Sequence, residues 1–386
     1  MKNLLFSITV ILILVGCNIQ QPSSNFDKNP ASANLDISSE NQFPDGELNV
    51  HFLDVGQADA TLFQVAENDK QYVILIDSGD FTGNEVVSYL EEAGLEKINI
   101  AIGTHPDADH IGQMDQVLNH FDVDEVWLSG NTSQSDTFQR VLMAISENNV
   151  DYVEPRMGES YKLGPLQIDI LYPQEISGKA NEESISMKIT YGEVSFVFTG
   201  DAEKKSEKEM IESGAQLQAT FLQLGHHGSS TSTSEEFLQA VRPEVAIYSA
   251  GNDNSYGHPH EEVVSLIKNS GIALYGTDVD GTVIVTTDGK TYTIKTKKAG
   301  QVPAGKTFEQ PSEMDIQNKS NGSCIDINTA RAEEIEGIVH IGPERAHDLI
   351  ALRPYYSIEE LEKINGIGPA RINDIKKEGL ACIGGN

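Results

Sequence analysis

Three short apolar runs in this chain each stop on residues of the types that bind metals. INIAIGT runs into THPDADH (Thr104–His110), FVFTGD (Phe196–Asp201) stops on Gly-Asp, and LQLGHHGSS (Leu222–Ser230) carries a histidine pair. Imidazoles and carboxylates at this density are costly to bury without partners, and a metal ion would satisfy them. The pattern favours a fold that gathers strand ends around a metal, although a solvated polar loop at 104–110 is the alternative.

The rest of the central region predicts one domain of mixed strands and helices. From Leu48 onward, β-rich runs such as LNVHFLD and YVILID alternate with helix-like segments such as VVSYLEEAG. The run GTVIVTTDGKTYTIKT predicts a closing hairpin that turns at Asp288-Gly289. Because 39% of the 386 residues are hydrophobic, the chain can bury a core, and we expect an α/β (α+β) domain over 47–297.

Charge and cysteine content argue against three classes of protein. The net charge of −32 argues against binding nucleic acid through bulk positive charge, so any such contact must be local or bridged by metal. Three cysteines with no C-x-x-C pair exclude a disulfide-dense scaffold and a structural zinc ribbon.

The N-terminus predicts export and a lipid anchor. An apolar run from Leu4 to Val15 is long enough for a signal-peptide core but short for a membrane span. It ends Leu14-Val15-Gly16-Cys17, which resembles a bacterial lipobox and implies a signal peptide over 1–16 and acylation of Cys17. An uncleaved anchor helix is the alternative, and both place the remainder outside the cytoplasmic membrane. The Ser-, Asn- and Pro-rich segment 17–46 predicts a disordered tether.

The ordered motifs of the central region resemble a known family. HFLDVGQADATL, ILIDSG, THPDADHIG, FVFTGD, LGHHGSSTS and NDNSYGHPH follow the order found in the hydrolase domain of the bacterial competence protein ComEC. That domain has the metallo-β-lactamase fold, so the resemblance implies an αββα sandwich with metals bound at one edge. It also implies two divalent metal ions and hydrolytic activity.

The resemblance also implies which residues bind the metals. His105 and Asp107 face one ion, Asp109 and His110 face the second, Asp201 bridges them, and His226 or His227 completes the set. Asp107 stands where the wider fold has a second histidine, and the histidine expected before the Gly-Asp strand is absent from the region of Asn181–Ser184. A site richer in oxygen favours Mn²⁺ or a similarly hard ion, with Zn²⁺ as the alternative.

Several polar residues near these motifs are candidates for supporting roles. Asp77 and Asp54 could orient a ligand from behind, or could be ordinary strand-end turn residues. His258 matches the family motif YGHP and could protonate a leaving oxygen or bind a phosphate, which makes it a catalytic candidate beside Asp109. Weaker candidates, more typical of polar loops, are His260, Ser229, Ser230 and Ser234.

The C-terminal region predicts a small helical domain over 322–386 after a polar linker at 298–321. Two motifs, Val339–Pro343 and Asn365–Pro369, resemble tandem helix-hairpin-helix units, and IDINTA with SIEELEKINGIG resembles the DNA receptor ComEA. Bare backbone N–H groups at Gly342, Gly366 and Gly368 could approach phosphate oxygens without reading sequence.

Two features of this region qualify that expectation. His340 replaces the leading glycine of the first hairpin, and 324–386 holds 7 basic against 11 acidic residues, which is unusually acidic for a DNA binder. A structural or protein-contact module is therefore the alternative. Cys324 and Cys382 flank the region and either pair or remain free thiols.

Together these features predict a lipid-anchored, extracytoplasmic metallohydrolase that cleaves phosphodiesters in DNA, with hairpins that hold the strand nonspecifically. The alternatives are a hydrolase of another envelope or small-molecule ester, and a noncatalytic DNA-capture lipoprotein. DNA and the membrane are the expected partners, and nothing in the sequence points to a protein partner.

Overall fold

A computed structural model describes residues 44–298, 324–355 and 357–383. The predicted signal peptide and Cys17 lie outside the described residues, as do nearly all of the predicted tether and the 298–321 linker. In the described part of the chain, no helix has both the length and the apolar composition needed to cross a membrane.

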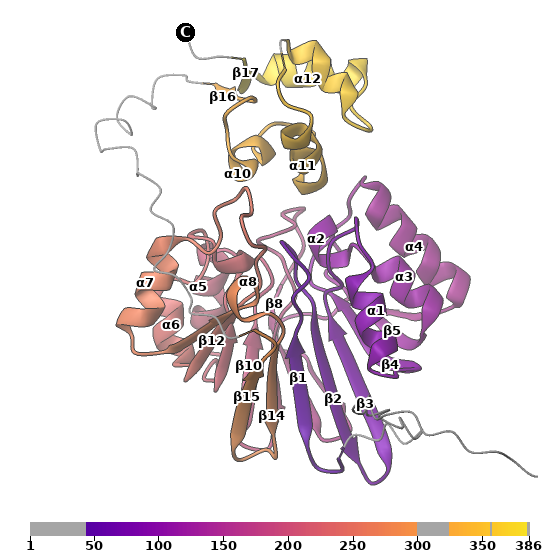
Figure 1. The fold of residues 1–386 in the computed structure, drawn as a ribbon, viewed down its shortest axis with the longest axis vertical. Helices are drawn as coiled ribbons and strands as arrows, with labels where there is room; N and C mark the ends of the chain where they lie inside the picture. The colour runs from indigo at the N-terminus through magenta and orange to yellow at the C-terminus, as the bar shows by residue number, and fades with distance from the viewer. Residues whose placement is uncertain (1–43, 299–323, 356, 384–386) are drawn as a thin grey trace, which may run out of the picture. The chain divides into compact units, whose positions relative to one another are not determined.

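The central region contains two β-sheets (Figure 1). The first has the strand order β15-β14-β1-β2-β3-β4-β5-β6, with antiparallel pairing from β15 to β3 and parallel pairing from β3 to β6. Its strands are β1 (Leu48–Phe52), β2 (Thr61–Glu67), β3 (Lys70–Ile76), β4 (Lys97–Gly103), β5 (Asp122–Leu128), β6 (Asp151–Val153), β14 (Val283–Thr287) and β15 (Tyr292–Thr296).

The second sheet has the order β13-β12-β11-β10-β9-β8-β7, and the four strands β10 to β13 are parallel. Its strands are β7 (Ser160–Leu163), β8 (Leu166–Tyr172), β9 (Ser186–Tyr191), β10 (Val194–Phe198), β11 (Phe221–Gln223), β12 (Val245–Tyr248) and β13 (Ala273–Gly276). The predicted hairpin is β14–β15, and Gly289 in its turn has a φ of 84°, which favours glycine.

The two sheets pack face to face through an apolar core. β1 alternates fully buried Leu48, Val50 and Phe52 with half-buried positions, the pattern of a strand that presents one face to a core. Across the interface, the Phe52 ring stacks on Phe198 with centroids 6.0 Å apart. This interdigitated layer holds the two sheets in a sandwich.

Helices cover both outer faces (Figure 1). Apolar residues of α1, α3 and α4 pack on the first sheet, and those of α5, α6 and α7 pack on the second. The helices of this region are α1 (Glu85–Glu92), α2 (Ala108–Ile111), α3 (Met114–His120), α4 (Asp136–Asn148), α5 (Lys204–Glu212), the 3₁₀ turn η1 (His226–Gly228), α6 (Glu235–Val241), α7 (Glu261–Asn269) and α8 (Thr277–Asp280). The predicted αββα sandwich is confirmed.

The C-terminal region is predominantly helical and has its own core. Its elements are β16 (Ile325–Asp326), α10 (Ala332–Glu336), α11 (Pro343–Ala351), the 3₁₀ segment η2 (Ile358–Lys363), α12 (Pro369–Glu378) and β17 (Ala381–Cys382). Within the small helical domain predicted over 322–386, the segment Ile358–Lys363 is a 3₁₀ helix rather than an α-helix. β16 and β17 form a two-stranded parallel sheet, and Cys324 and Cys382 pair in a disulfide beside it.

Candidate metal centre

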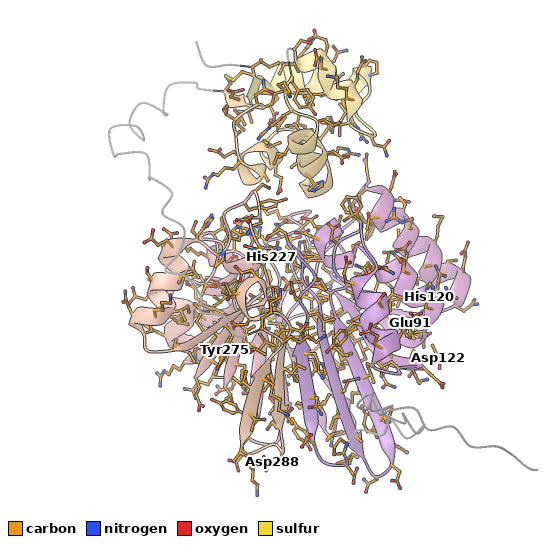
Figure 2. The ribbon with its side chains drawn as sticks, viewed as in Figure 1. Glu91, His120, Asp122, His227, Tyr275 and Asp288 are labelled. Carbon is orange, nitrogen blue, oxygen red and sulfur yellow. A yellow bond between two sulfur atoms is a disulfide. The ribbon has the colours of Figure 1, made fainter. Side chains whose placement is uncertain are left out.

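The predicted ligands follow the carboxyl ends of parallel strands in both sheets. The loop after β4 carries His105–His110, Asp201 follows β10, and His226 and His227 follow β11. His227 lies at the end of the sandwich where these loops gather, and Asp288 in the β14–β15 turn lies at the opposite end (Figure 2). Because parallel strands of each sheet end at the same edge, residues more than 100 positions apart meet there.

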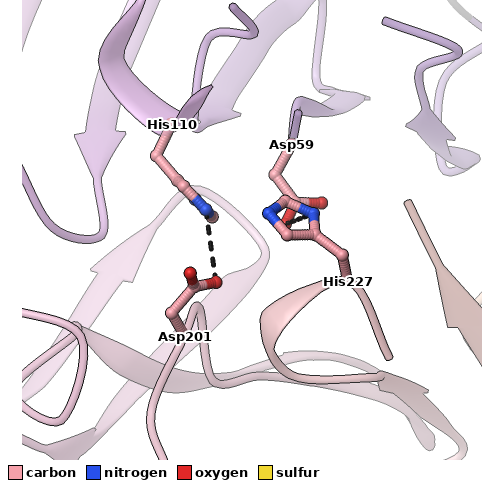
Figure 3. Close-up of side chains that lie close together, drawn as sticks. All are labelled: Asp59, His110, Asp201 and His227. Atoms are coloured by element: carbon pink, nitrogen blue, oxygen red, sulfur yellow. Dashed lines mark ion pairs between the residues drawn. The ribbon is translucent and has the colours of Figure 1, made fainter. Parts of the chain in front are cut away.

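Asp201 lies between two groups of histidines. Its Oδ1 is 3.2 Å from Nε2 of His110 (Figure 3). Its Oδ2 is 3.4 Å from Nε2 of His226 and 3.6 Å from Nε2 of His105. One carboxylate therefore presents a different oxygen to each group.

Each histidine group also has its own carboxylate. On the Oδ2 side, Asp107 Oδ2 lies 3.5 Å from Nε2 of His105. On the Oδ1 side, Asp109 Oδ2 lies 3.3 Å from Nε2 of His227. The sequence left open whether His226 or His227 belongs to the site, and the structure brings both to it, one on each side of Asp201.

A buried aspartate that was not among the predicted ligands also belongs to this cluster. Asp59 is 3% exposed, and its Oδ2 lies 3.5 Å from Nδ1 of His227 (Figure 3). Gln223 donates to its other oxygen. One ligand atom from each of Asp59, His110, Asp201 and His227 lies within 4.8 Å of the others. The available signal was an acid set between two alanines in the motif HFLDVGQADATL.

Hydrogen bonds behind the ligands set which ring nitrogen faces the cluster. Asp77 Oδ2 accepts from Nδ1 of His110 at 2.8 Å, and its Oδ1 accepts from the Thr104 backbone N–H at 2.8 Å. The Thr104 hydroxyl donates to Asp77 at 3.0 Å, so its oxygen accepts from Nδ1 of His105 at 3.1 Å. The Ser249 carbonyl likewise accepts from Nδ1 of His227 at 3.1 Å. In all three rings Nδ1 holds a proton, and Nε2 is the nitrogen directed to the carboxylates.

Asp54, the other predicted orienting residue, lies elsewhere. Its carboxylate pairs with Lys298 at 2.7 Å, and its backbone N–H donates to Thr282 at 3.1 Å. Among the described residues, none of its contacts is with a predicted ligand. The expectation for Asp54 is therefore not met, because its carboxylate pairs with Lys298, shortly after β15, and Asp59 lies behind His227 instead.

The segment Asn181–Ser184, where the wider fold would place a further histidine, supplies other polar groups. Asn181 lines the same pocket as Asp107 and Asp201. Glu183 is turned away, since its carboxylate accepts from the backbone N–H groups of Ser177, Gly178 and Lys179 and from Asn131. Two residues of this segment therefore reach the site: Asn181 lines the pocket, and the Ser184 hydroxyl accepts from the Asp201 backbone N–H at 3.2 Å.

The residues after β12 complete one wall of this pocket. His258 is 3% exposed and lines the pocket with Asp109 and Asp201. Its ring centroid is 5.6 Å from that of His226. His260 accepts from the Ser230 backbone N–H at 2.9 Å, and Ser234 caps α6 by accepting from Phe237, so these two side chains have structural partners.

The electrostatics of the cluster favour cations. Burial alone would raise the pKa of Asp201, but the imidazoles of His226, His110 and His105 outweigh it and hold that pKa well below its usual range. Burial lowers the pKa of His227, yet its hydrogen bond with Asp109 and the charge of Asp59 outweigh burial and raise that pKa to about 9. The site therefore keeps Asp201 ionised and attracts positive charge, which either a proton or a metal ion supplies.

The donor set fits a divalent metal ion. Nε2 of His105, Nε2 of His110 and Oδ1 of Asp201 are buried and have no hydrogen-bond partner among the described residues. Such atoms are costly to bury unless something binds them, and imidazole nitrogen and carboxylate oxygen suit divalent metals. The chain thus presents a buried His/Asp cluster with the chemistry of a metal site.

In the C-terminal region the two hairpin motifs adopt matching conformations. Gly342 and Gly368 are the N-cap residues of α11 and α12. Gly366 has a φ of 77°, and His340 at the equivalent place takes a φ of 69°. Nε2 of His340 lies 3.1 Å from Asp374, so this histidine contacts an acidic residue of the second unit.

Comparison with known proteins identifies both regions. Residues 53–252 match the metallo-beta-lactamase superfamily, and residues 320–378 match the helix-hairpin-helix motif. ComE operon protein 3 of Bacillus subtilis (strain 168) is 31% identical over 254 residues, which cover 61% of this chain and 33% of that protein. Recombination protein 2 of Haemophilus influenzae (strain ATCC 51907 / DSM 11121 / KW20 / Rd) is 33% identical over 245 residues, covering 61% of this chain and 28% of that protein.

A third relative matches a shorter segment. The deoxyribonuclease of Thioalkalivibrio sp. (strain K90mix) is 37% identical over 79 residues, which cover 20% of this chain and 22% of that protein. The chain therefore spans about a third or less of the length of each of these three curated relatives.

Proposed function

This chain belongs to the metallo-beta-lactamase superfamily, and from that premise we propose that it is a metal-dependent phosphodiesterase that cleaves DNA outside the cytoplasmic membrane. The observation that carries the proposal is Asp201, whose two carboxylate oxygens face two separate histidine groups. A carboxylate in that position is suited to bridge two cations.

The residues present would hold two divalent ions. His105, Asp107 and His226 would bind one with Oδ2 of Asp201, and Asp109, His110 and His227 would bind the other with Oδ1. Two such ions activate a water molecule and stabilise the charge that develops on a phosphate during hydrolysis. Asp107 and Asn181 add oxygen donors, which favour Mn²⁺ over the Zn²⁺ of histidine-rich sites.

The chain's own residues prepare the site for this chemistry. Asp77, Thr104 and Ser249 hold protons on Nδ1 of three histidines, so the Nε2 atoms of these rings would be available to bind cations. His258 lies in the wall of the same pocket, where it can contact a phosphate oxygen. The site needs no nucleophilic side chain, because water is the nucleophile.

Two observations favour DNA as the substrate. One relative that matches part of this chain is a deoxyribonuclease, and two others are named ComE operon protein 3 and Recombination protein 2. The helix-hairpin-helix region would hold the strand through backbone N–H groups at Gly342, Gly366 and Gly368, without reading its sequence. Local contacts of this kind are compatible with a net charge of −32.

The location and domain division are part of the same proposal. The lipobox-like Leu14–Cys17 would place an acylated Cys17 in the membrane, with 17–46 as a tether. The hydrolase domain would span 47–297 and the hairpin domain 322–386, joined by the linker 298–321.

The test is DNA cleavage by the metal-stripped full-length chain after Mn²⁺, Zn²⁺ or Mg²⁺ is added back, with single- and double-stranded DNA as substrates. Asp201→Asn keeps the shape of the side chain but removes its charge, and Asp122→Asn, an exposed position at the start of β5, is the matched control. We expect metal-dependent cleavage that Asp201→Asn abolishes and Asp122→Asn retains. Folded, metal-loaded protein that cuts neither DNA, or cleavage that survives Asp201→Asn, would contradict the proposal.

A further inference from the structure

His258 differs from His105, His110 and His227 in the group that faces its Nδ1. The three rings of His105, His110 and His227 each have an oxygen acceptor at Nδ1. Nδ1 of His258 instead lies 3.3 Å from Nε2 of Gln57, which is the nitrogen of a side-chain amide. The partner at Nδ1 decides which nitrogen of a neutral imidazole carries the proton.

The orientation of the Gln57 amide is fixed by the backbone. Its Oε1 lies 3.0 Å from the N–H of Gly251, and a backbone N–H can only donate. The atom that meets Gly251 must therefore be the oxygen, and the NH₂ group faces His258. An amide NH₂ has donors but no acceptor, so Gln57 donates and Nδ1 of His258 accepts.

The two side chains are held in place by the loop after β12. Asn254 accepts from the His258 backbone N–H at 3.0 Å and donates to the His258 carbonyl at 2.7 Å. A Cβ on residue 251 would lie 2.7 Å from the backbone nitrogen of Gln57, so glycine permits this close approach. Asn254 thus holds the His258 backbone in place, and Gly251 holds the Gln57 side chain in place.

We propose that Gln57 is a positioning residue that keeps the ring proton of His258 on Nε2, so that His258 serves as a hydrogen-bond donor to a phosphate oxygen of the substrate. This inference rests on the proposed phosphodiesterase function. A ring that accepts at Nδ1 carries one N–H, at Nε2, and that nitrogen has no lone pair left to bind a metal. The site therefore contains two kinds of histidine: His105, His110 and His227 each have an acceptor at Nδ1, whereas His258 has a donor there.

This assignment narrows the role of His258. The sequence left open whether this residue protonates a leaving oxygen or binds a phosphate. Because Gln57 opposes a proton on Nδ1, the ring acts by hydrogen bonding and its proton stays on Nε2. A fixed donor aimed at developing negative charge is an effective form of transition-state stabilisation.

The test reads the position of the proton directly. The full-length chain, labelled with ¹⁵N-histidine and loaded with diamagnetic Zn²⁺, is examined by two-dimensional NMR that correlates ring nitrogens with ring carbon-bound protons. The spectrum of His258→Asn assigns the signals of His258 by their loss. We expect Nδ1 of His258 at the far-downfield position of an unprotonated nitrogen and Nε2 at the position of a protonated one. The opposite pattern would overturn the inference even if the protein cuts DNA.

A variant that keeps the shape of the Gln57 side chain tests whether Gln57 itself sets the position of the His258 ring proton. In Gln57→Glu, one carboxylate oxygen can still accept from Gly251 while the other now faces His258 as an acceptor. We expect the Nδ1 signal to move to the protonated position, whereas Gln139→Glu, an exposed residue of α4, leaves it unchanged. An unmoved Nδ1 signal in folded Gln57→Glu would overturn the positioning role. If Gln57→Glu does not fold, Gln57→Leu removes the donor and should still broaden or shift the Nδ1 signal of His258. An unchanged signal in Gln57→Leu would contradict the positioning role.

Kinetics separate this inference from the proposed function. With Mn²⁺ and bis(4-nitrophenyl) phosphate as probe, Gln57→Glu should lower kcat about 100-fold, the effect of losing one fixed donor, with little change in KM. An unchanged kcat would refute the donor role. If the wild type hydrolyses no phosphodiester but shows Nε2 protonated, the proposed function fails while the control of the tautomer by Gln57 stands.

Discussion

Replacing Asp77 with asparagine should weaken metal binding although Asp77 itself touches no metal. Asp77 Oδ2 accepts from Nδ1 of His110 and from the Thr104 hydroxyl, while Oδ1 accepts from the Thr104 backbone N–H. In Asp77→Asn the backbone N–H keeps the amide oxygen, because it can only donate. The NH₂ group must then face His110, where it opposes the Nδ1 proton and favours the tautomer that cannot bind a cation through Nε2.

The magnitude follows from the hydrogen bond that is lost. A bond to a charged acceptor contributes about 1.5–3 kcal/mol, which corresponds to about 10- to 150-fold in an equilibrium constant. Replacing groups that orient metal-binding histidines generally costs about 10- to 100-fold in affinity, so the two estimates agree. We therefore expect metal affinity to fall by one to two orders of magnitude.

The assay is competition for Mn²⁺ or Zn²⁺ between the metal-stripped protein and a fluorescent chelator, with circular dichroism to confirm folding. Asp122→Asn, which loses an exposed carboxylate paired with Lys97, is the matched control and should bind like the wild type. Folded Asp77→Asn with wild-type affinity would refute the reasoning that Asp77 sets the tautomer of His110.

Three further predictions concern stability. Reducing the Cys324–Cys382 disulfide, which closes a loop with a sequence separation of 58, should lower the unfolding free energy of the C-terminal region by about 4 kcal/mol, as measured by urea titration with and without reductant. Burial and the charge of Lys297 lower the pKa of His51 to about 4. The unfolding free energy should therefore fall by about 3 kcal/mol as the pH drops from 6.5 toward 4, because the unfolded chain binds the proton first. In His51→Gln, urea unfolding at several pH values should show a flatter profile over this range. Glu183→Gln should lower stability by about 1–3 kcal/mol in thermal or urea unfolding, because backbone N–H groups donate to its carboxylate, and unchanged stability would contradict this.

Much of the site could be predicted because its residues follow strands. The position of an apolar run is readable from sequence, and parallel strands end at a common edge, so His105, Asp201 and the histidine pair were expected together. Asp59 could not be found in this way, since it lies in the loop between β1 and β2 and reaches His227 only after the two sheets pack.

The remaining differences between the predicted and the observed site arise because some residues contact partners that lie far away in the sequence. Asp54 and Asp77 both end strand-like runs, and only the structure shows that Lys298 pairs with Asp54 while His110 contacts Asp77. The sequence likewise could not decide whether His226 or His227 belongs to the metal site. Adjacent residues in the 3₁₀ turn η1 both take positive φ, which sends their side chains to opposite sides of Asp201, and no periodicity in the sequence encodes that turn.

The central claim is that Asp201 joins two metal subsites, and anomalous diffraction from crystals of the chain grown with Mn²⁺ tests it most directly. The prediction is two anomalous peaks, one at Oδ1 of Asp201 beside His110 and one at Oδ2 beside His105 and His226. Both peaks should weaken in Asp201→Ala. A fully occupied metal away from Asp201, or no bound Mn²⁺ or Zn²⁺ at this cluster, would contradict the claim.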